Sequence, residues 1–400
     1  MVRITESRAI ELANEAVALG HFEQALKGLP DPRRAQGLRY PLRTVVVIAL
    51  MSMVCGCDDA EAMEAWGEVN EAWLSTFLEV PHGVPTQDVF LNVFGALCPT
   101  QFSAVFQAWA SLVTLRIPRE GTHIAIDGKT SRRSADRNRD KPNIHTVSAW
   151  HCGAGIVLTQ RQTGEKSNEI AAIPELLRVL DLKGATITID AMGCQTEIAH
   201  TIISGGGDYL LSVRDNQPTL RAEIEETFRE VDDPRPRAFD EPARPTTTVC
   251  TTTEKGHGRL ETRTVRVCTN MTWLGTRARW KEFNFVAEIT RERTILTTGK
   301  LSRERVHYIG SDAALSAEKV ARLARAHWSI ENALHWTLDV AFREDDTRHR
   351  AKNTAANLTT LRHFALAVVK RDPTRRLGVA NSRKIAGFDR AYLVRLIQGA

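Results

Sequence analysis

The sequence predicts a mixed α/β fold, with an all-α N-terminal domain ahead of a core whose sheet is interrupted by a β-rich insertion. Apolar stretches follow the helical period up to about residue 115. From Thr122 short strand-like runs alternate with helical ones, and between Val231 and Ser302 the helical signal disappears. The chain has 400 residues, of which 42% are hydrophobic and 25% charged, which suits two or three globular domains. This composition excludes a disordered chain and a small disulfide scaffold.

The first predicted domain, residues 1–115, is helical, with apolar stretches separated by Pro, Gly and Asp-Asp. Its longest apolar run, Thr44 to Val54, is about half of the ~20 residues that a membrane-spanning helix needs, so we expect a buried helix. The N-terminus carries charges where a signal peptide has its apolar core, and the seven cysteines are odd in number and scattered. These features favour a reducing cytoplasm.

Residues 116–230 form the first part of the predicted core, with the element order βββαβαβα. Three strand-like runs come first, of which the last two form a hairpin; they are HIAID, IHTVSAWH and GIVLTQRQ. Pro174 is expected to open a short helix, because proline is accepted at the first helical position. The buried strand ATITID, a helix over 195–203, the strand YLLSV and a helix near Pro218 complete the order.

The rest of the chain divides into three predicted segments. Residues 231–304 are a β-rich insertion, because runs such as LETRTVRVC and FNFVAEIT alternate like strands of an antiparallel sheet. Residues 305–372 are the second part of the core, in which one helix begins after Ser316 as its N-cap and another ends before Asp372. Residues 373–400 are a basic C-terminal segment.

Positive charge is concentrated in two places. Residues 341–400 contain thirteen Lys and Arg against five Asp and Glu, and residues 128–141 contain six against two. The net charge of the whole chain is only +5, so the remainder is acidic. Such clusters suit a polyanion, because each phosphate contact releases condensed counterions. The alternative is a solvated surface or a basic tail.

Two carboxylates end predicted buried strands in matching positions. Asp127 closes the run IAID, and Asp190 closes the run ITID. The carboxyl ends of strands in mixed sheets commonly open onto a ligand crevice, and a buried carboxylate needs a cation, a basic side chain or a helix N-terminus. A single such Asp is typical of an N-cap or a turn, but two on one predicted sheet favour a functional site.

A third carboxylate, Glu331, is indicated by the helical period. It falls on a mainly apolar stripe with spacings of three and four residues, so we expect it to point inward. The stripe consists of Val320, Ala324, His327, Glu331, Leu334 and Leu338. Either Glu331 pairs with Arg325 or Arg343, or it meets Asp127 and Asp190 from a helix packed on the sheet. Three carboxylates suit Mg²⁺ or Mn²⁺, and two such ions ~3.5–4 Å apart serve phosphodiester cleavage.

The acids that follow Glu331 are weaker candidates for this third position. Asp339 lies ~80° around the helix from Glu331 and off the apolar stripe. The remaining three lie in an arginine-rich segment, where local ion pairs explain them without a metal. They are Glu344, Asp345 and Asp346.

Two further motifs carry less information. Residues 128–130, Gly-Lys-Thr, resemble the end of a phosphate-binding loop, but residue 123 is His where that motif requires Gly, so a P-loop is excluded. His257 lies in a predicted turn, and Arg259 and Arg263 can project along the following strand. These residues form either a surface turn or a contact to the DNA backbone.

Five blocks of the sequence resemble successive signatures of the DDE transposases of bacterial insertion sequences, specifically the H-repeat-associated group. In chain order they are IAIDGKTSRRS, ITIDAMGCQTEIA, YLLSVRDNQ, HGRLETR and HWSIENALHWTLDVAFREDDTRHR. The N-terminal stretch LPDPRRAQGLRYPL, with CGCDD and PTQDVFLNVF, is similar to the helical domain associated with that group. The resemblance implies an RNase-H-like mixed-sheet core with a β-rich insertion, and it implies the catalytic triad Asp127, Asp190 and Glu331.

The sequence departs from related transposases around the last acid. Those proteins carry Tyr-x2-Arg-x3-Glu-x6-Lys, whereas the corresponding residues here are Ala324, His327, Glu331 and Leu338. Only the glutamate matches. Arg325, His327 and the group from Arg348 to Arg350 are candidates to replace the missing DNA contacts.

These observations predict a metal-dependent DNA transposase that binds the terminal inverted repeats of its own element. Water cuts a phosphodiester at the element end, and the freed 3′-hydroxyl then attacks target DNA. Asp127 and Asp190 hold two Mg²⁺ or Mn²⁺ ions, and Glu331 completes the shell of the second. Candidates to position phosphates are Lys129, Arg132 and Arg133. By resemblance we expect a homodimer on double-stranded DNA, with no membrane partner, at the nucleoid of a bacterial cytoplasm.

Two other functions stay open at this point. One is a catalytically silent DNA-binding remnant or repressor, which the intact triad argues against. The other is a nuclease on the same fold without strand transfer, which only a joining assay separates from a transposase.

Overall fold

The chain folds as two compact units that do not follow its order. The computed structural model describes residues 22, 25–34, 38–114, 121–135, 142–163, 169–236, 245–256, 258–271, 273–372 and 377–399. Unit 1 consists of Met1–Ile117, Gly128–Asn168 and Glu331–Ala400, and unit 2 consists of Pro118–Asp127 and Glu169–Ile330. The chain therefore passes between the units four times, and two of these crossings fall within strand β1 (His123–Thr130) and between Ile330 and Glu331.

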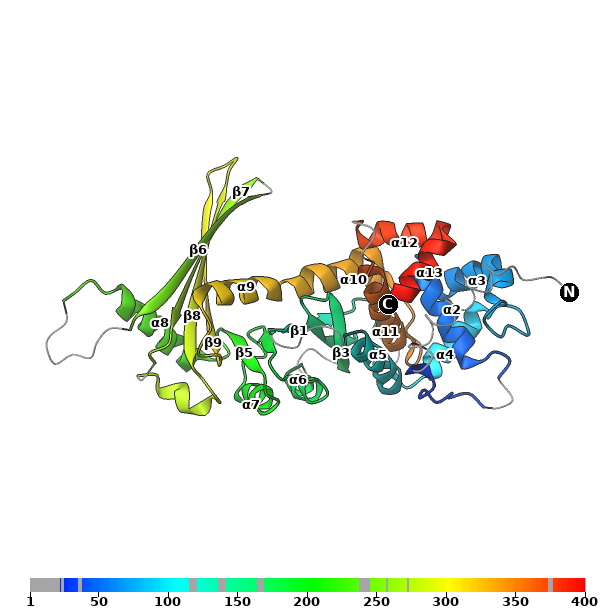
Figure 1. Cartoon of the computed structure of the whole chain (residues 1–400), viewed down its shortest axis with the longest axis horizontal. Helices are drawn as coiled ribbons and strands as arrows, with labels where there is room; N and C mark the ends of the chain where they lie inside the picture. Colours follow the sequence, from blue (N-terminus) through cyan, green and yellow to red (C-terminus); the bar gives the residue numbers. More distant parts are fainter. Residues whose placement is uncertain are drawn as a thin grey trace. The chain divides into compact units, whose positions relative to one another are not determined.

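Nine strands in the described part of the chain form one mixed sheet, in the order β3-β2-β1-β4-β5-β9-β8-β7-β6 (Figure 1). β1, β4 (Thr186–Ile189) and β5 (Asp208–Val213) are parallel neighbours, whereas β2 (His145–His151) and β3 (Ile156–Thr163) form an antiparallel hairpin. β4 is a run of β-branched Thr and Ile, all buried, which favours extended backbone. The predicted α/β class and the order βββαβαβα are confirmed, and the first five strands have the RNase-H-like arrangement.

Helices flank the strands of unit 2. They are α6 (Glu169–Arg178), α7 (Thr196–Ser204), α8 (Pro218–Asp232), the 3-10 helix η4 (Gly275–Arg279) and α9 (Ala317–His327). α8 begins with Pro218, as predicted. α9 begins after Ser316, whose hydroxyl accepts a hydrogen bond from the Lys319 N–H at 3.3 Å, which confirms the predicted N-cap.

The expectation that Pro174 opens its helix is wrong. α6 already includes Glu169, so Pro174 lies inside the helix, in its second turn. Ala172 and Ile173, which precede the proline, are buried and continue the apolar face of the helix. The missing N–H of Pro174 removes one backbone hydrogen bond. Packing of the residues before the proline therefore outweighs the proline as a start signal.

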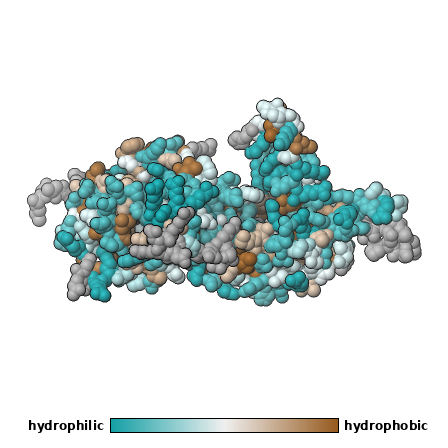
Figure 2. All heavy atoms as spheres, turned by 180° about the vertical axis from the view of Figure 1, so that it is seen from behind, coloured by the Kyte–Doolittle hydropathy of each residue, from teal (hydrophilic) through white to brown (hydrophobic). Residues whose placement is uncertain are grey.

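The predicted insertion extends the sheet of unit 2 by antiparallel pairing. Its strands are β6 (Thr247–Gly256), β7 (Arg259–Cys268), β8 (Phe285–Ile295) and β9 (Leu301–Gly310). β9 also pairs with β5, so the insertion joins the core sheet directly. β9 is absent from the predicted elements, because its first half is exposed and polar and shows no apolar alternation. β6, β7, β8 and β9 project together beyond the core strands of unit 2 (Figure 1), and the side of this projection seen in Figure 2 is mainly hydrophilic.

α9 covers one face of these strands. Val320, Leu323 and Ala324 of α9 pack with buried residues of β7 and β8 in one apolar cluster. The strand residues of that cluster are Val265, Val267, Phe285, Ala287 and Ile289. This packing fixes α9 along the sheet of unit 2.

Unit 1 is built around α11 (Thr354–Lys370), which is buried from Thr354 to Val369. The elements packed against it are α2 (Leu42–Val54), α4 (Gln87–Ala96), α5 (Pro99–Thr114), α10 (Trp336–Ala341), α12 (Val379–Phe388), α13 (Arg390–Gly399) and β3. Unit 1 also contains β2, α3 (Ala60–Leu74), the π-helix η5 (Ile330–His335), which begins at the unit boundary, and the 3-10 helix η6 (Glu344–Asp346). α2 is buried from Thr44 to Val54, which confirms the predicted buried helix.

Several polar groups on the buried α11 have hydrogen-bond partners within unit 1. The amide of Asn357 donates to the carbonyl oxygens of Phe94 at 2.7 Å and Leu97 at 3.0 Å. Gln160 on β3 donates to the Thr360 hydroxyl at 2.7 Å. These bonds offset the desolvation cost of a helix that is buried on every side.

The described part of the basic C-terminal segment, residues 377–399, forms α12 and α13. Arg383 on α12 is buried and donates to the carbonyl oxygen of Met53 at 2.7 Å. Its guanidinium also pairs with Asp58 and lies 3.8 Å from the ring centroid of Phe342. At least this positive charge is therefore an internal contact of unit 1.

Among the described residues, no single helix is long and apolar enough to cross a bilayer. α4 and α5, bent by 94° at the break between them, reach that length and composition only as a pair. Their large apolar residues, such as Phe90, Phe94 and Phe106, are buried in the core of unit 1.

We predict that Gly310→Ala destabilises unit 2. Gly310 lies opposite Phe285 in the β8–β9 pair, and a Cβ at this position would be 2.0 Å from Cζ of that ring. Because Phe285 is buried, it has no room to move aside, and we expect a loss of about 1–3 kcal/mol in the free energy of unfolding. Gly256→Ala is the control, since nothing lies within 4 Å of a Cβ there. Equal unfolding free energies of the two variants in a guanidinium titration would contradict the steric argument.

Candidate active site

Asp127 and Asp190 directly follow the last paired residues of β1 and β4. The register of β1 and β4 places Ile126 opposite Ile189, and each aspartate is the next residue along its strand. Neighbouring strands lie ~4.8 Å apart, so the two backbone positions are adjacent. Both side chains are half-buried. The expectation that each aspartate ends its strand is confirmed for Asp190 and wrong for Asp127, because β1 continues to Thr130. Both residues belong to one sheet edge by register, and their role as metal ligands stays a prediction.

The chain after Asp190 turns sharply back towards the core. The carboxylate Oδ1 of Asp190 accepts a hydrogen bond from the Gly193 N–H at 3.3 Å. A Cβ at Gly193 would lie 2.2 Å from Cγ2 of Ile189, so only glycine allows the backbone to pass this close. Burial, together with the charge of Asp190, raises the pKa of the following Cys194 to about 12, which keeps that thiol protonated.

A second loop holds this turn from the end of β5. Asn216 donates from Nδ2 to the carbonyl oxygen of Ala191 at 2.6 Å. Gln217 donates from Nε2 to the carbonyl oxygen of Cys194 at 3.0 Å. Hydrogen bonds from the block YLLSVRDNQ therefore hold the backbone in place on both sides of Gly193.

α9 is anchored to β4 by a chain of polar side chains. The hydroxyl of Thr188 lies 2.8 Å from Nδ1 of His327 and 2.8 Å from Nε2 of His123 on β1. Burial lowers the pKa of His327 to about 4, so its ring is neutral at neutral pH. His327 therefore supplies no positive charge to this region at neutral pH, and a phosphate contact by this residue stays a prediction.

Glu331 does not point inward as predicted: its side chain is exposed. α9 ends at His327, and the helix continues as the π-helix η5 before α10 begins. The wider π turn shifts the positions that follow, so spacing rules for a regular α-helix no longer apply across it. Ile330 and Leu334 are buried instead.

The partners considered for a buried Glu331 are engaged elsewhere. Arg325 pairs with Glu254 on β6, and Nε of Arg343 lies 3.3 Å from Oδ2 of Asp346. Pairing of Arg343 within its own segment confirms a local ion pair for Asp346. The same expectation is wrong for Glu344 and Asp345, whose ion pairs are with Lys129, more than 200 residues away in the chain. The exposed carboxylate of Glu331 is thus not explained by either arginine.

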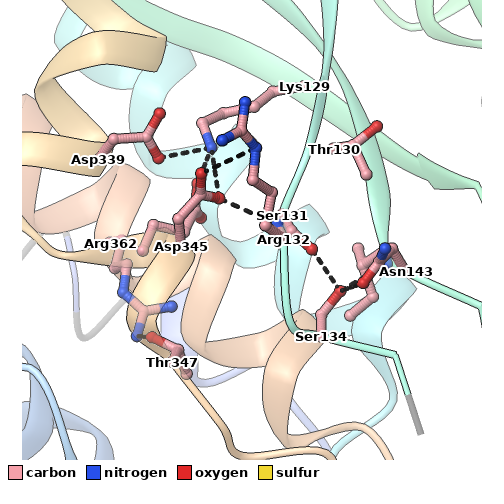
Figure 3. A network of polar contacts seen from close by, with 12 residues as sticks. Lys129, Thr130, Ser131, Arg132, Ser134, Asn143, Asp339, Asp345, Thr347 and Arg362 are labelled. Carbon is pink, nitrogen blue, oxygen red and sulfur yellow. Dashed lines mark hydrogen bonds and ion pairs between the residues drawn. The ribbon is translucent and has the colours of Figure 1, made fainter. Parts of the chain in front are cut away.

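Lys129, a predicted phosphate contact, lies among carboxylates of unit 1 (Figure 3). Its Nζ is 2.7 Å from Oδ1 of Asp339, 3.2 Å from Oε2 of Glu344 and 3.4 Å from Oδ1 of Asp345. The Lys129 side chain is only 11% exposed. An ammonium has three donors, and three carboxylates surround this one.

The arginines that follow Lys129 are more accessible. Arg132 is 83% exposed in its side chain, and its backbone N–H donates to Oδ1 of Asp345 at 2.9 Å. Arg133 lies 3.2 Å from Asp346. Arg350 donates from Nε to the carbonyl oxygen of Arg133 at 2.9 Å, and Arg348 is exposed. A contact of these residues to phosphates stays a prediction.

The basic residues of the insertion differ in their surroundings. Arg259 is exposed at the start of β7. Arg263 pairs with Glu261, and its Nη1 lies 3.8 Å from Glu254. His257, the remaining candidate in this turn, lies outside the described residues.

The described residues hold no group of three or more His, Cys, Asp or Glu side chains that could bind a metal ion together. Asp127 and Asp190 supply the hard oxygen ligands that Mg²⁺ and Mn²⁺ prefer. The donor chemistry of the two aspartates therefore fits a hard divalent ion, with a further ligand required.

Several residues of this region carry no signal in the sequence analysis. Thr188 and His123 are inconspicuous members of buried strands. Asn216 and Gln217 belong to a quoted block, but a role for them needed the position of the turn after Asp190. The partners of Lys129 lie more than 200 positions away in the chain, and no local pattern connects them.

Comparison with known protein families identifies the class of protein as a DDE transposase. Residues 118–368 match the family model described as transposase DDE domain, and residues 23–110 match the one described as DDE_Tnp_1-associated. The chain belongs to the DDE transposase family, whose domains use divalent metal ions and act on DNA.

Relatives cover nearly the whole chain. It is 35% identical over 376 residues to the protein YbfL of Escherichia coli strain K12, spanning 93% of this chain and 96% of that one. It is 34% identical, with the same coverage, to a protein of that strain named "H repeat-associated putative transposase YhhI". The structure of the piggyBac transposase synaptic complex with hairpin DNA has a TM-score of 0.41 at 11% identity, covering 96% of this chain and 80% of that one.

We predict that His327 makes the stability of unit 2 pH-dependent. The unfolded histidine takes up a proton near its ordinary pKa of 6.5, but the folded one does so only near 4. Stability therefore falls as the pH drops from 6.5 towards 4, with a slope of up to about 1.4 kcal/mol per pH unit. His327→Gln removes this contribution, and guanidinium titrations between pH 4.5 and 7 measure it. If the free energy of unfolding of the variant changes with pH in parallel with that of the wild type, His327 is not the source of the pH dependence.

Proposed function

We propose that this protein is the transposase of an insertion sequence, which binds the terminal inverted repeats of its element, cuts at their ends and joins them to target DNA. Membership of the DDE family supports the reaction class. The specific steps and the recognised ends are our proposal.

The observation that carries this proposal is the common register of β1 and β4, in which an aspartate directly follows the last paired residue of each strand. We assign Glu331 as the third carboxylate. His327, bonded to Thr188 two residues before Asp190, lies one helical turn before Glu331 in the chain. The exposure of Glu331 leaves its carboxylate accessible, as a metal ligand requires.

Asp127, Asp190 and Glu331 are proposed to hold two Mg²⁺ or Mn²⁺ ions. When bound, such ions stabilise charge on the attacking and leaving oxygens of an in-line displacement. The backbone bonds of Asn216 and Gln217 keep the turn after Asp190 in place. Preorganised ligands of this kind reduce the rearrangement needed to reach the reactive geometry.

Two displacements follow in this proposal. In the first, the oxygen of water forms a bond to phosphorus at the element end while the bond from phosphorus to the 3′-oxygen breaks, leaving a 3′-hydroxyl and a 5′-phosphate. In the second, that 3′-hydroxyl forms a bond to a target phosphorus, loses its proton, and displaces a target 3′-oxygen. The number of phosphodiester bonds is conserved in the second step.

Basic side chains are proposed to contact the DNA backbone. The set consists of Arg132, Arg133, His257, Arg259, Arg263, Arg325, His327, Arg348 and Arg350. Exposed members such as Arg132 and Arg348 are accessible to phosphates without breaking a buried contact. We further propose a homodimer on double-stranded DNA, acting at the nucleoid in the cytoplasm of a bacterium.

The test is incubation of the purified protein with DNA that contains the element ends, with Mg²⁺ or Mn²⁺, and separation of nicked, hairpin and joined products. Joined products support the proposal. Cut ends without joining would make the protein a nuclease, and binding without cutting would make it a silent DNA-binding remnant.

We predict that Asp190→Asn abolishes cleavage while end binding stays intact. The substitution removes one ligand charge and no positive side chain, so the loss should exceed the ~10–100-fold typical of contacts outside the ligand shell. Asp181→Asn, on an exposed loop of the same unit, is the matched control. Cleavage by Asp190→Asn at close to the wild-type rate would remove Asp190 from the site.

We predict that Glu331→Gln also eliminates metal-dependent cleavage, whereas Asp339→Asn retains measurable activity. Asp339 is half-buried beside Lys129, so its carboxylate already has a cation. Cleavage rates at saturating Mn²⁺ decide between the two acids. The reverse order of activities would assign Asp339 as the third carboxylate.

A further inference from the structure

The cluster around Lys129 joins two segments that are far apart in sequence. Lys129 lies on β1, two residues after Asp127, while its partners lie on α10 and η6. Asp339 is on α10, which follows directly on the π-helix that contains Glu331. Glu344 and Asp345 form part of η6, immediately beyond α10. All four charged groups belong to unit 1.

Burial and charge both argue against a phosphate at Lys129. Burial by itself would lower the pKa of Lys129, but Glu344, Asp339 and Asp345 outweigh it and raise that pKa. Glu344, whose side chain is 2% exposed, has a lowered pKa despite burial, because Lys129 and Arg362 lie close to it. A phosphate entering here would have to displace buried carboxylates from their cation and would be repelled by them.

Further contacts fasten the same two segments to each other. Arg132 donates from its backbone to Asp345, and Arg133 pairs with Asp346. Arg133 has a φ of 62° and Arg343 has a φ of 49°, a left-handed conformation that a residue with a Cβ adopts only when its surroundings hold it. Both arginines contact Asp346, one from each segment.

The last residue of the π-helix faces the same cluster. Burial, then the nearby charge of Lys129, lowers the pKa of His335 to about 3. Its ring is therefore neutral beside the cation. The carboxylates that pair with Lys129 lie on α10 and η6, and all of them follow Glu331 in the chain.

We propose that Lys129 is a positioning residue of the transposase, which through Asp339, Glu344 and Asp345 fixes the carboxyl end of β1 to the helix that carries Glu331. This inference rests on the proposed function, because it gives Lys129 its role through Asp127 and Glu331. Lys129, two residues after Asp127, then helps to position the carboxylates of Asp127 and Glu331 and makes no contact with DNA.

The test compares full-length wild type with Lys129→Met. Three properties are measured: end binding at several salt concentrations, the single-turnover cleavage rate, and the Mn²⁺ concentration that gives half of the maximal rate. We expect the cleavage rate to fall by about 100-fold, a loss typical of enzymes whose catalytic groups are displaced. The half-saturating Mn²⁺ concentration should rise by about tenfold. The log–log salt slope of binding should stay unchanged, whereas loss of one phosphate contact would lower it by about 0.9.

Two further variants keep the test decisive. Val47→Ala, in the buried helix α2 of the same unit, reduces stability away from the cluster and should leave the Mn²⁺ requirement unchanged. Asp339→Asn leaves Lys129 with two carboxylates, and we expect a smaller rise in the Mn²⁺ requirement. It replaces Lys129→Met as the decisive variant if the latter does not fold.

Each remaining outcome overturns the inference. A shallower salt slope with an unchanged Mn²⁺ requirement would make Lys129 a phosphate contact. If Lys129→Met is less stable and its cleavage rate falls only as much as that of Val47→Ala, the cluster is purely structural. Wild-type protein that binds the ends without cutting them would overturn the proposed function itself, and the positioning role with it.

Discussion

In the pairing of β1 with β4, Ile126 lies opposite Ile189, and this one register brings Asp127 and Asp190 to neighbouring positions after the paired residues. A slip by one residue would place Asp127 beside an isoleucine and reverse the direction of every side chain on the strand. The buried residues of both strands oppose such a slip, because their apolar side chains would lose their packing. β4 also carries Thr188, which anchors α9. The aspartate pair and the attachment of the helix before Glu331 therefore depend on the same strand.

Basic residues that cluster in the sequence do not all form a positively charged surface in the structure. Lys129 lies in one basic stretch and Arg383 in the other, yet both are buried and paired with carboxylates. The same compensation occurs on the insertion, where Arg263 pairs with Glu261. A count of charges in a segment thus overstates what is available to a polyanion. Exposed residues such as Arg132 are a better guide to a DNA surface, because they lose little by changing partners.

Much of the fold could be predicted, because hydrophobic period and turn residues are local properties. The order of the first eight core elements and the N-cap at Ser316 follow from neighbouring residues alone. The exposure of Glu331 could not be predicted, since a π-helix changes the phase without a distinct sequence signal. β9 escaped prediction because its polar first half resembles a loop. The partners of Lys129 required the tertiary structure, as a buried lysine and an exposed one look alike in sequence.

The position of α11 near the end of the chain has a consequence during synthesis. α2, α4 and α5 pack on α11, yet about 240 residues separate the end of α5 at Thr114 from the start of α11 at Thr354. At the usual ~5–20 residues per second, a ribosome needs about 12–48 s to make that stretch. Throughout this interval the apolar faces of the first helices lack their partner, including Phe94 and Trp109. The nascent chain is therefore a natural substrate for chaperones, and a product that stops before α11 leaves these faces uncovered for good.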